Sequence, residues 1–501
     1  MKKILLTTLA VAFTAGYVLG GGIVTNTNQS ASWVRTLSRN ASTGIDAVYF
    51  NPAGLGKLNN GLHFSLNNQT ILQNKDVTTT FNYLRLNQSI ADTTFKYEGK
   101  VSAPVFPGVY AVYKMDKLAF SFGFNPVGGG GGAKYDNGLP SFEVPLSTVV
   151  PILQGSLAPL DQAIAAATGT DPHFRNVTKY QFSTNFEGTS VYFGYQFNAT
   201  YQVTDMLGVA LGARYVTAKN TYKGFLKEYQ INAPDSCGGW QTPGNYLRTV
   251  ASTPGLDATT KATLQGTAAV LDVQTGDKEV DAEQTGTGFT PLLGLHFSPM
   301  EKLNIALKYE FKTAMKVKTS INDNKDGGGL FKKDSTINSD MPAMLAAGLD
   351  YNVLPSLKLS VSYNYYFDKN ADYGKSLEGQ PVTNDKVIDK NFYEIAFGAE
   401  YSITEKFLVS AGFLHAQTGV KENYQSDQSF SLTSNTIGGG LLFKLNEKIG
   451  INLGYAYTMY DKGSKDYKVP INVPIGATEK PAKDEYFKKT MIFSAGVDIS
   501  L

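Results

Sequence analysis

Strict alternation of apolar and polar residues along many long segments constrains the fold of this chain more than any other feature. In "KLAFSFGFNP", four large apolar residues alternate with small or polar ones: Leu118, Phe120, Phe122 and Phe124. Residues 303–312 repeat this pattern. A period of two places successive side chains on opposite faces of an extended strand. Similar segments recur from residue 61 to the end of the chain, so the sequence predicts a protein built mainly of β-strands.

Fourteen such segments are predicted as strands, which is an even number. They cover residues 61–72, 103–115, 117–126, 189–203, 206–222, 284–298, 301–317, 341–353, 356–369, 390–403, 405–419, 430–446, 448–461 and 486–501. Many exceed the roughly 9–11 residues that a tilted strand needs to cross a bilayer. A soluble β-sandwich or propeller is the alternative, but strands in soluble domains average about five or six residues. Large aromatic residues on one face also favour a membrane barrel.

The connections between these segments differ greatly in length. Several are very short, such as Asp116, Thr404 and Glu447, whereas residues 127–188 and 223–283 form long insertions. Short turns at one rim and long loops at the other are typical of bacterial outer-membrane barrels. The sequence therefore predicts an all-β fold, a fourteen-stranded antiparallel transmembrane β-barrel over residues 61–501. Residues 127–188 and 223–283 are predicted to be its long extracellular loops.

The N-terminal residues have the pattern of a secretory signal peptide. Lys2 and Lys3 precede an apolar run over residues 4–13, and small residues follow that offer several cleavage points. The apolar run is too short to span about 30 Å of hydrocarbon. We therefore predict that residues 1–21 are a signal peptide and that the mature chain is exported to the outer membrane.

Composition and motifs argue against several classes of function. The formal net charge is only +2, without a dense basic run, so no nucleic-acid partner is expected. The single cysteine, Cys237, cannot form an internal disulfide or a thiolate zinc cluster. The four histidines are scattered and no Gly-x-Ser-x-Gly motif occurs. The sequence thus predicts a protein that is not an enzyme and uses no metal or cofactor.

A barrel of this size needs something to fill its lumen. Eight-stranded barrels are filled by side chains, whereas barrels of 16–18 strands hold an aqueous channel. Residues 22–60 show no clear alternation and are long enough to fold inward as a plug. The inferred inward faces are partly apolar, for example at Ala210, Leu408 and Leu442. We therefore predict an N-terminal hatch over residues 22–60 and an apolar ligand in the lumen.

The first long insertion contains two further patterns. Five glycines at 128–132 are interpreted as a flexible hinge at the barrel rim. Leu157, Leu160 and Ile164 recur at helical spacing. This helix either covers a small core of the loop itself or exposes an apolar groove that captures hydrophobic molecules.

The stretch "ASTGIDAVYFNPAGLGKL" resembles the hatch motif of the FadL family, outer-membrane transporters of long-chain fatty acids and related hydrophobic compounds. The matching hatch residues are Phe50, Asn51, Pro52, Ala53 and Gly54. The resemblance implies passive uptake, in which extracellular loops capture the ligand, a lumen pocket receives it, and movement of the hatch releases it. Ligand can then leave sideways through a gap in the barrel wall. We expect a monomer in outer-membrane lipid, with hydrophobic small molecules as ligands.

Three basic residues are candidates for binding a ligand head group. Arg214, Lys308 and Lys312 lie on the inferred inward faces of two strands, with Glu310 between the two lysines. A carboxylate entering an apolar lumen needs a cationic partner, because an unpaired buried charge is costly. The alternative is that these cations form salt bridges that tie the lumen to the hatch.

Two other functions remain open from the sequence. Some relatives of the FadL family serve as outer-membrane components of protein-secretion systems, and the resemblance therefore allows that function. A general porin is the second alternative, and it would require a wetter lumen lining than this sequence predicts.

Overall fold

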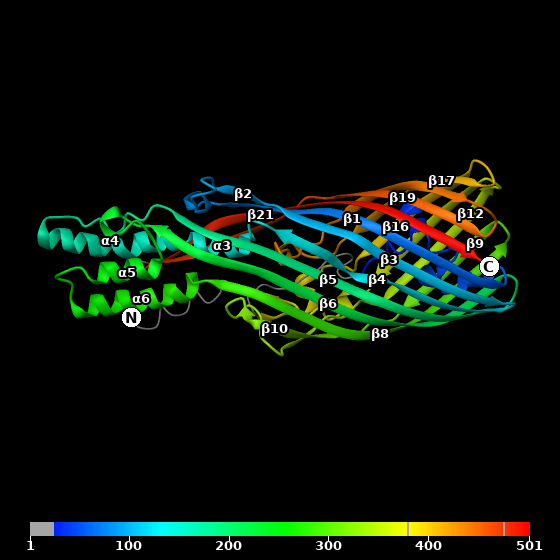
Figure 1. Cartoon of the computed structure of the whole chain (residues 1–501), viewed down its shortest axis with the longest axis horizontal. Helices are drawn as coiled ribbons and strands as arrows, with labels where there is room; N and C mark the ends of the chain where they lie inside the picture. Colours follow the sequence, from blue (N-terminus) through cyan, green and yellow to red (C-terminus); the bar gives the residue numbers. More distant parts are fainter. Residues whose placement is uncertain (1–24, 378–379, 474–475) are drawn as a thin grey trace.

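The computed structural model describes residues 25–377, 380–473 and 476–501, so the predicted signal peptide lies outside the described residues. Fourteen strand positions form one antiparallel sheet, which closes because β21 pairs with β1 (Figure 1). The predicted fold class is confirmed. In order around the barrel the strands are β1 (Gly61–Phe81), β3 (Gly99–Met115), β4 (Leu118–Tyr135), β5 (Tyr180–Gln202), β6 (Leu207–Asn232), β8 (Lys278–Met300), β9 with β10 (Leu303–Glu310 and Lys316–Asp326), β12 (Met344–Leu354), β13 (Leu357–Tyr366), β16 (Tyr393–Ser402), β17 (Phe407–Gln417), β18 (Ser434–Lys444), β19 (Ile449–Tyr460) and β21 (Gly476–Ser500).

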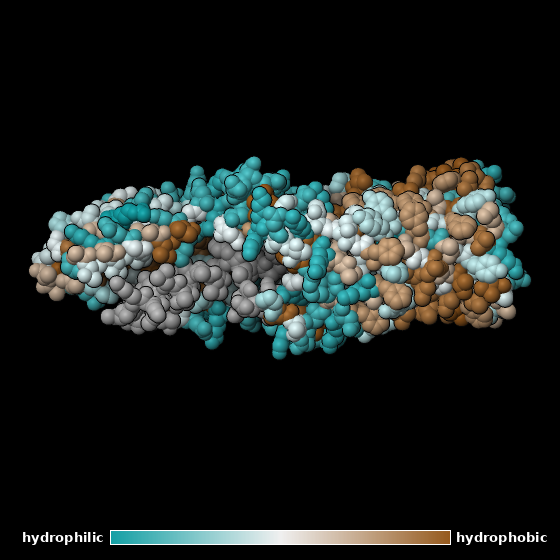
Figure 2. Space-filling model, turned by 90° about the horizontal axis from the view of Figure 1, so that it is seen from below, coloured by the Kyte–Doolittle hydropathy of each residue, from teal (hydrophilic) through white to brown (hydrophobic). Residues whose placement is uncertain are grey.

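In the face shown in Figure 2, apolar residues form a band at the end of the barrel where the short turns lie. Its large side chains point outward and are exposed, for example Leu72 on β1, Leu211 on β6 and Phe493 on β21. Above the band the outward positions become charged, as at Lys219 and Glu485. Exposed apolar side chains on the outer face are what a lipid-facing barrel requires. Among the described residues, no helix has the length and apolar character needed to cross a membrane.

The strands continue well above this band, which corrects the predicted loop boundaries. β4 runs to Tyr135 and β5 starts at Tyr180, so residues 136–179 leave the sheet rather than 127–188. Residues 233–277 replace the predicted 223–283 as the connection between β6 and β8. Above the membrane the outer face is polar and the inner face covers a second core, so the simple apolar alternation stops before the strands do. The glycines at 128–132 belong to β4 and are not a separate hinge.

Four helices pack on this second core at the outer end of the barrel (Figure 1). They are α3 (Pro140–Ser147), α4 (Val149–Thr168), α5 (Pro243–Ala251) and α6 (Ala258–Thr275). In α4, Leu157 is buried, and the partly buried Leu160 and Ile164 pack against the same cluster. These three residues therefore cover the core of the insertion, as the first of the two interpretations predicts.

Short elements complete the described chain. The strands are β2 (Thr94–Tyr97), β7 (Trp240–Gln241), β11 (Thr336–Asn338), β14 (Ser376–Leu377), β15 (Gln380–Pro381) and β20 (Gly463–Val473); the helices are η2 (Leu84–Leu86), η3 (Asp235–Cys237), η4 (Asp368–Asn370), α7 (Asn384–Val387) and η5 (Glu422–Tyr424). β20 pairs with the outer part of β21 and extends the wall above the membrane.

The N-terminal segment lies inside the lumen as three short helices. These are α1 (Ala31–Thr36), α2 (Ala47–Phe50) and η1 (Pro52–Lys57). α1 packs against β16 to β19 and β21, whereas η1 packs against β4, β5, β6 and β8. Ser30 caps α1 by accepting a hydrogen bond from the backbone of Trp33. Because the two halves contact different walls, the segment crosses the lumen as a plug.

Candidate functional site

The Asn-Pro-Ala motif is bonded both to itself and to the barrel wall. The Oδ1 atom of Asn51 accepts a hydrogen bond from the backbone of Ala53 at 3.2 Å, as the predicted turn requires. Its Nδ2 atom donates to the carbonyl of Leu295 on β8 at 2.7 Å. Thr200 on β5 donates to the carbonyl of Pro52 at 2.7 Å. The motif therefore fixes the hatch to two strands of the wall.

Gly54 and Phe50 complete the motif through close packing. A Cβ atom added at Gly54 would lie 2.2 Å from the carbonyl oxygen of Ser42, which is closer than any real contact. Only glycine allows the hatch to fold back on itself at this point. Phe50 is buried and its ring packs edge-on against the ring of Tyr49, with 5.1 Å between the centroids.

Two of the predicted head-group cations bind Glu310 instead of facing open space. Arg214 donates to both carboxylate oxygens of Glu310 at 2.8 and 2.9 Å, and Lys308 donates to it at 2.7 Å. Lys308 also donates to the backbone carbonyl of Tyr49 at 2.8 Å. Both cations lie over the ring of Tyr49, 5.0 and 4.7 Å from its centroid. This cluster ties the hatch to β6 and β9, in the arrangement that the salt-bridge alternative describes.

Lys312, the third candidate, lies apart from that cluster. Its side chain is 43% exposed and pairs with Asp340 at 2.9 Å. It sits in the break between β9 and β10, where the alternation of the strand is interrupted. A direct role of Arg214, Lys308 or Lys312 in ligand binding stays a prediction.

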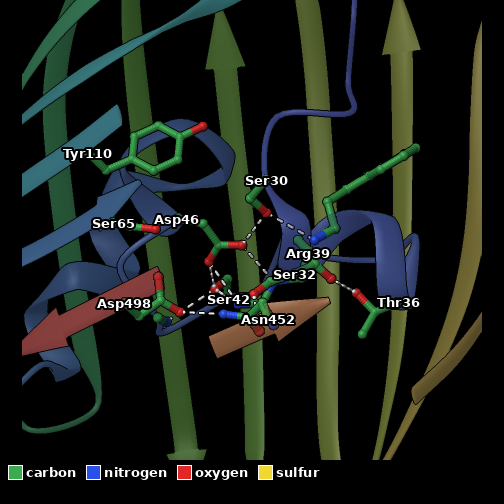
Figure 3. A network of polar contacts seen from close by, with 12 residues as sticks. Ser30, Ser32, Thr36, Arg39, Ser42, Asp46, Ser65, Tyr110, Asn452 and Asp498 are labelled. Atoms are coloured by element: carbon green, nitrogen blue, oxygen red, sulfur yellow. Dashed lines mark hydrogen bonds and ion pairs between the residues drawn. The ribbon is translucent and has the colours of Figure 1, made fainter. Parts of the chain in front are cut away.

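A second polar network holds the other half of the hatch (Figure 3). Asp46 accepts hydrogen bonds from Arg39 at 2.7 and 2.9 Å, from Ser42 at 2.7 Å and from Ser30 at 2.9 Å. Arg35, on α1, pairs with Glu400 on β16. Separating the partners of a buried ion pair is strongly unfavourable, so these ion pairs hold the hatch in one position in the lumen.

The barrel wall is open between β3 and β4. These strands pair over 99–101 with 133–135 and again over 109–115 with 118–124, but residues 102–108 and 125–132 do not pair with each other. The opening is level with residues 68–72 of β1, where the exposed Leu72 belongs to the apolar band. The gap therefore faces the hydrocarbon part of the membrane.

Prolines and glycines in the two strands explain why the pairing fails there. Pro104 and Pro107 on β3 and Pro126 on β4 have no N–H to donate to a neighbouring strand. The glycines that follow Pro126 include Gly129 at φ 94°, a conformation that bends the strand away from regular pairing. This signal is visible in "APVFPG" and "NPVGGGGG", and it predicts an interruption once β3 and β4 are known to be neighbours.

The start of the hatch binds the backbone of β4 within this opening. The backbone of Asn26 donates to the carbonyl of Val127 at 2.9 Å, and its side chain donates to that of Gly129 at 3.1 Å. Gln29 donates to the carbonyl of Pro126 at 2.9 Å. The hatch thus takes up hydrogen-bonding positions that β3 leaves empty, so a shift of the hatch would change the opening.

A pocket of about 270 Å³ connects the lumen with the wall opening. Its lining is mostly apolar and includes Val105, Phe106 and Phe193 at the opening. Lys488 and Glu394 are the only charged residues among the described residues that line it. Glu394 accepts hydrogen bonds from Asn364 and Tyr366 on β13. Lys488 makes no ion pair within the described chain; its amine lies 4.8 Å from the centre of the Tyr460 ring.

Sequence reasoning did not select Lys488 as a candidate. Alternation along β21 places it on the inward face, and this signal is present in "YFKKTMIF". Carboxylates on other strands determine which of the inward cations remains unpaired.

No group of three or more potential metal ligands occurs in the part of the chain that the structure describes.

The comparisons with known proteins identify the family. A family model described as "Outer membrane protein transport protein (OMPP1/FadL/TodX)" matches residues 160–498. The chain belongs to this FadL/TodX family. The FadL resemblance and the outer-membrane location are therefore confirmed, and so is the prediction that the chain is a transport protein rather than an enzyme. No curated protein matches the chain.

Solved structures of the FadL/TodX type share this fold. A FadL homologue from Pseudomonas aeruginosa is 14% identical, with a TM-score of 0.55 and coverage of 97% of this chain and 100% of that chain. The Pseudomonas putida toluene transporter TodX is 14% identical, with a TM-score of 0.52 and coverage of 94% of this chain and 98% of that chain. At this identity the likeness supports the fold alone.

Proposed function

We propose that this FadL/TodX-family protein takes up long-chain fatty acids passively from outside the cell. Family membership gives the transport of hydrophobic compounds across the outer membrane. The fatty-acid assignment is carried by one observation: Lys488, which makes no ion pair within the described residues, lines a mainly apolar pocket. A neutral aromatic hydrocarbon needs no cation, whereas a carboxylate in such a pocket does.

The contacts of the hatch support a lateral route. Ligand enters from the outer mouth, reaches the pocket, and leaves through the opening between β3 and β4. Movement of the segment that binds Val127 and Gly129 would widen this exit, because its hydrogen bonds border the opening. No chemistry or nucleotide is required, since the ligand moves down its concentration gradient.

Replacing Lys488 with glutamine tests the ligand class. Losing a hydrogen bond to a charged group costs about 1.5–3 kcal/mol, so the Kd for oleate should rise roughly tenfold or more. Binding of toluene, which has no charge, should not change. The measurement is equilibrium binding of labelled oleate to purified protein, followed by oleate uptake in cells.

Lys489→Gln is the matched control, because it removes the same charge from the next residue on the opposite face of β21. Equal oleate affinity in the wild type and Lys488→Gln would contradict the fatty-acid assignment. Cells that take up oleate equally with and without the protein, but lose a secreted protein, would favour the secretion alternative. High ion conductance would favour a porin.

A further inference from the structure

Residues 418–433, here called the mouth segment, join β17 to β18 and fold into the outer mouth of the barrel. The segment reads "TGVKENYQSDQSFSLT" and is mostly polar, yet much of it is buried. Phe430, Ser431 and Leu432 line the pocket directly. The Phe430 ring packs against the ring of Tyr486 with 4.9 Å between the centroids. The mouth segment therefore forms a wall of the ligand pocket on its outer side.

Three hydrogen bonds from β1, β20 and α3 hold the tip of the mouth segment, residues 425–428. Lys75 on β1 donates to the carbonyl of Gln428, and Lys465 on β20 donates to the carbonyl of Gln425 at 3.1 Å. The backbone of Ser141, at the start of α3, donates to the carboxylate of Asp427 at 2.7 Å. These contacts are single hydrogen bonds at the tip of the segment. Its N-terminal part is held more firmly, because Gly419 and Lys421 bind residues 387–389.

Several polar groups of the mouth segment lose their hydrogen bonds in this closed position. The Tyr424 hydroxyl, both side-chain atoms of the Gln428 amide and the Ser429 hydroxyl are buried with no hydrogen-bond partner in the described chain. Burying such a group without a hydrogen-bond partner is unfavourable relative to its hydrated state. Water would satisfy all of them if the segment moved out, which lowers the cost of opening.

We propose that the mouth segment is the outer gate of the ligand pocket and swings away from Ser141 and Lys75 to admit the hydrophobic ligand. This inference rests on the proposed transport function and adds a second gate, on the side opposite the hatch. When the segment is closed, Phe430 and Leu432 complete the apolar lining. When it is open, the pocket communicates with the space below α3.

An acidic residue of the barrel wall beside the gate makes its opening depend on pH. Asp484 lies above the apolar band on β21, beside Asp427 of the gate, Lys465 and Tyr467 on β20, Thr79 on β1 and Tyr486 on β21. Burial raises the pKa of Asp484 to about 7, and Asp427 adds to this increase. A raised carboxyl pKa stabilises the closed form at low pH, and this stabilisation is lost as pH rises through about 7. The gate should therefore open more readily at pH 8 than at pH 6.

A disulfide between the gate and α3 tests the proposal. In a Cys237→Ser background, Ser141→Cys and Asp427→Cys are combined, and oleate uptake is measured under oxidising and reducing conditions. Uptake should fall with the cross-linked fraction, about tenfold when about nine-tenths of the molecules are cross-linked, and return on reduction. The control pair is Thr189→Cys with Thr221→Cys. The hydroxyls of these two threonines lie 2.5 Å apart, and the residues face each other on β5 and β6, away from the gate.

The outcomes separate the gate from the transport function. Oleate uptake that is unchanged by the Ser141–Asp427 disulfide would overturn the gate, whereas no uptake by the reduced protein would overturn the transport function. A Ser431→Cys variant gives a second measurement that needs no disulfide. Labelling of this buried residue by a membrane-impermeant maleimide should quicken from pH 6 to pH 8, and Asp484→Asn should remove that change. Labelling at a solvent-exposed rate at both pH values would contradict a closed gate.

Discussion

Val105→Trp should block most oleate uptake, because the new ring would fill the exit of the ligand pocket. Val105 lines the pocket within the stretch of β3 that does not pair with β4, and it is 69% exposed. A tryptophan there would need few rearrangements to fit, yet it would narrow the gap between the two strands. We expect uptake to fall roughly tenfold, which corresponds to about 1.4 kcal/mol added to the barrier.

Leu211→Trp is the matched control for this experiment. Leu211 lies on β6 in the same apolar band, is 64% exposed, and does not line the pocket. Both variants add a lipid-facing indole, so both should insert and fold alike. If the two variants carried oleate equally well at equal surface level, the ligand would have to leave by another route.

Glu310→Ala should destabilise the barrel and loosen the hatch. The change leaves Arg214 and Lys308 buried without their carboxylate, and each side chain is only 2% exposed. Removing one partner of a buried ion pair costs about 3–5 kcal/mol. We expect a lower thermal unfolding midpoint and a higher ion conductance in planar bilayers, because Tyr49 of the hatch loses its cationic contacts.

Asp136→Ala provides the comparison, since Asp136 pairs with Lys134 at the exposed end of β4. Exposed ion pairs contribute little to stability, so this variant should unfold like the wild type. A Glu310→Ala protein with an unchanged midpoint and unchanged conductance would show that the Glu310 cluster does not seat the hatch.

Most of the architecture follows from local sequence patterns. Alternation at residues such as 118–124 defines strands without knowledge of their neighbours, and the short turns fix an antiparallel order. The hatch motif is equally local, because Asn51 bonds the backbone two residues on. Local patterns do not predict the strand extensions above the membrane, because the inner face of these extensions packs against helices from distant insertions.

The candidate site depends on which strands are adjacent, and local patterns do not give that. An opening forms at Pro104, Pro107 and Pro126 only because β3 and β4 are neighbours in the sheet. Alternation places Lys308 and Lys488 alike on inward faces. Only the fold shows that Lys308 is bound by Glu310 and Tyr49. Lys488, in contrast, faces the pocket and makes no ion pair in the described chain.

Photo-cross-linking with a long-chain fatty acid that carries a diazirine near its tail shows directly where the ligand binds. We expect the ligand to lie in the pocket between the hatch and the wall opening. Adducts mapped by mass spectrometry on the purified protein should therefore fall on Phe106, Phe193 and Phe430. Excess oleate should suppress them. Adducts confined to outward residues of the apolar band, such as Phe289 and Phe397, with the pocket residues unlabelled, would show that the fatty acid does not bind in this pocket.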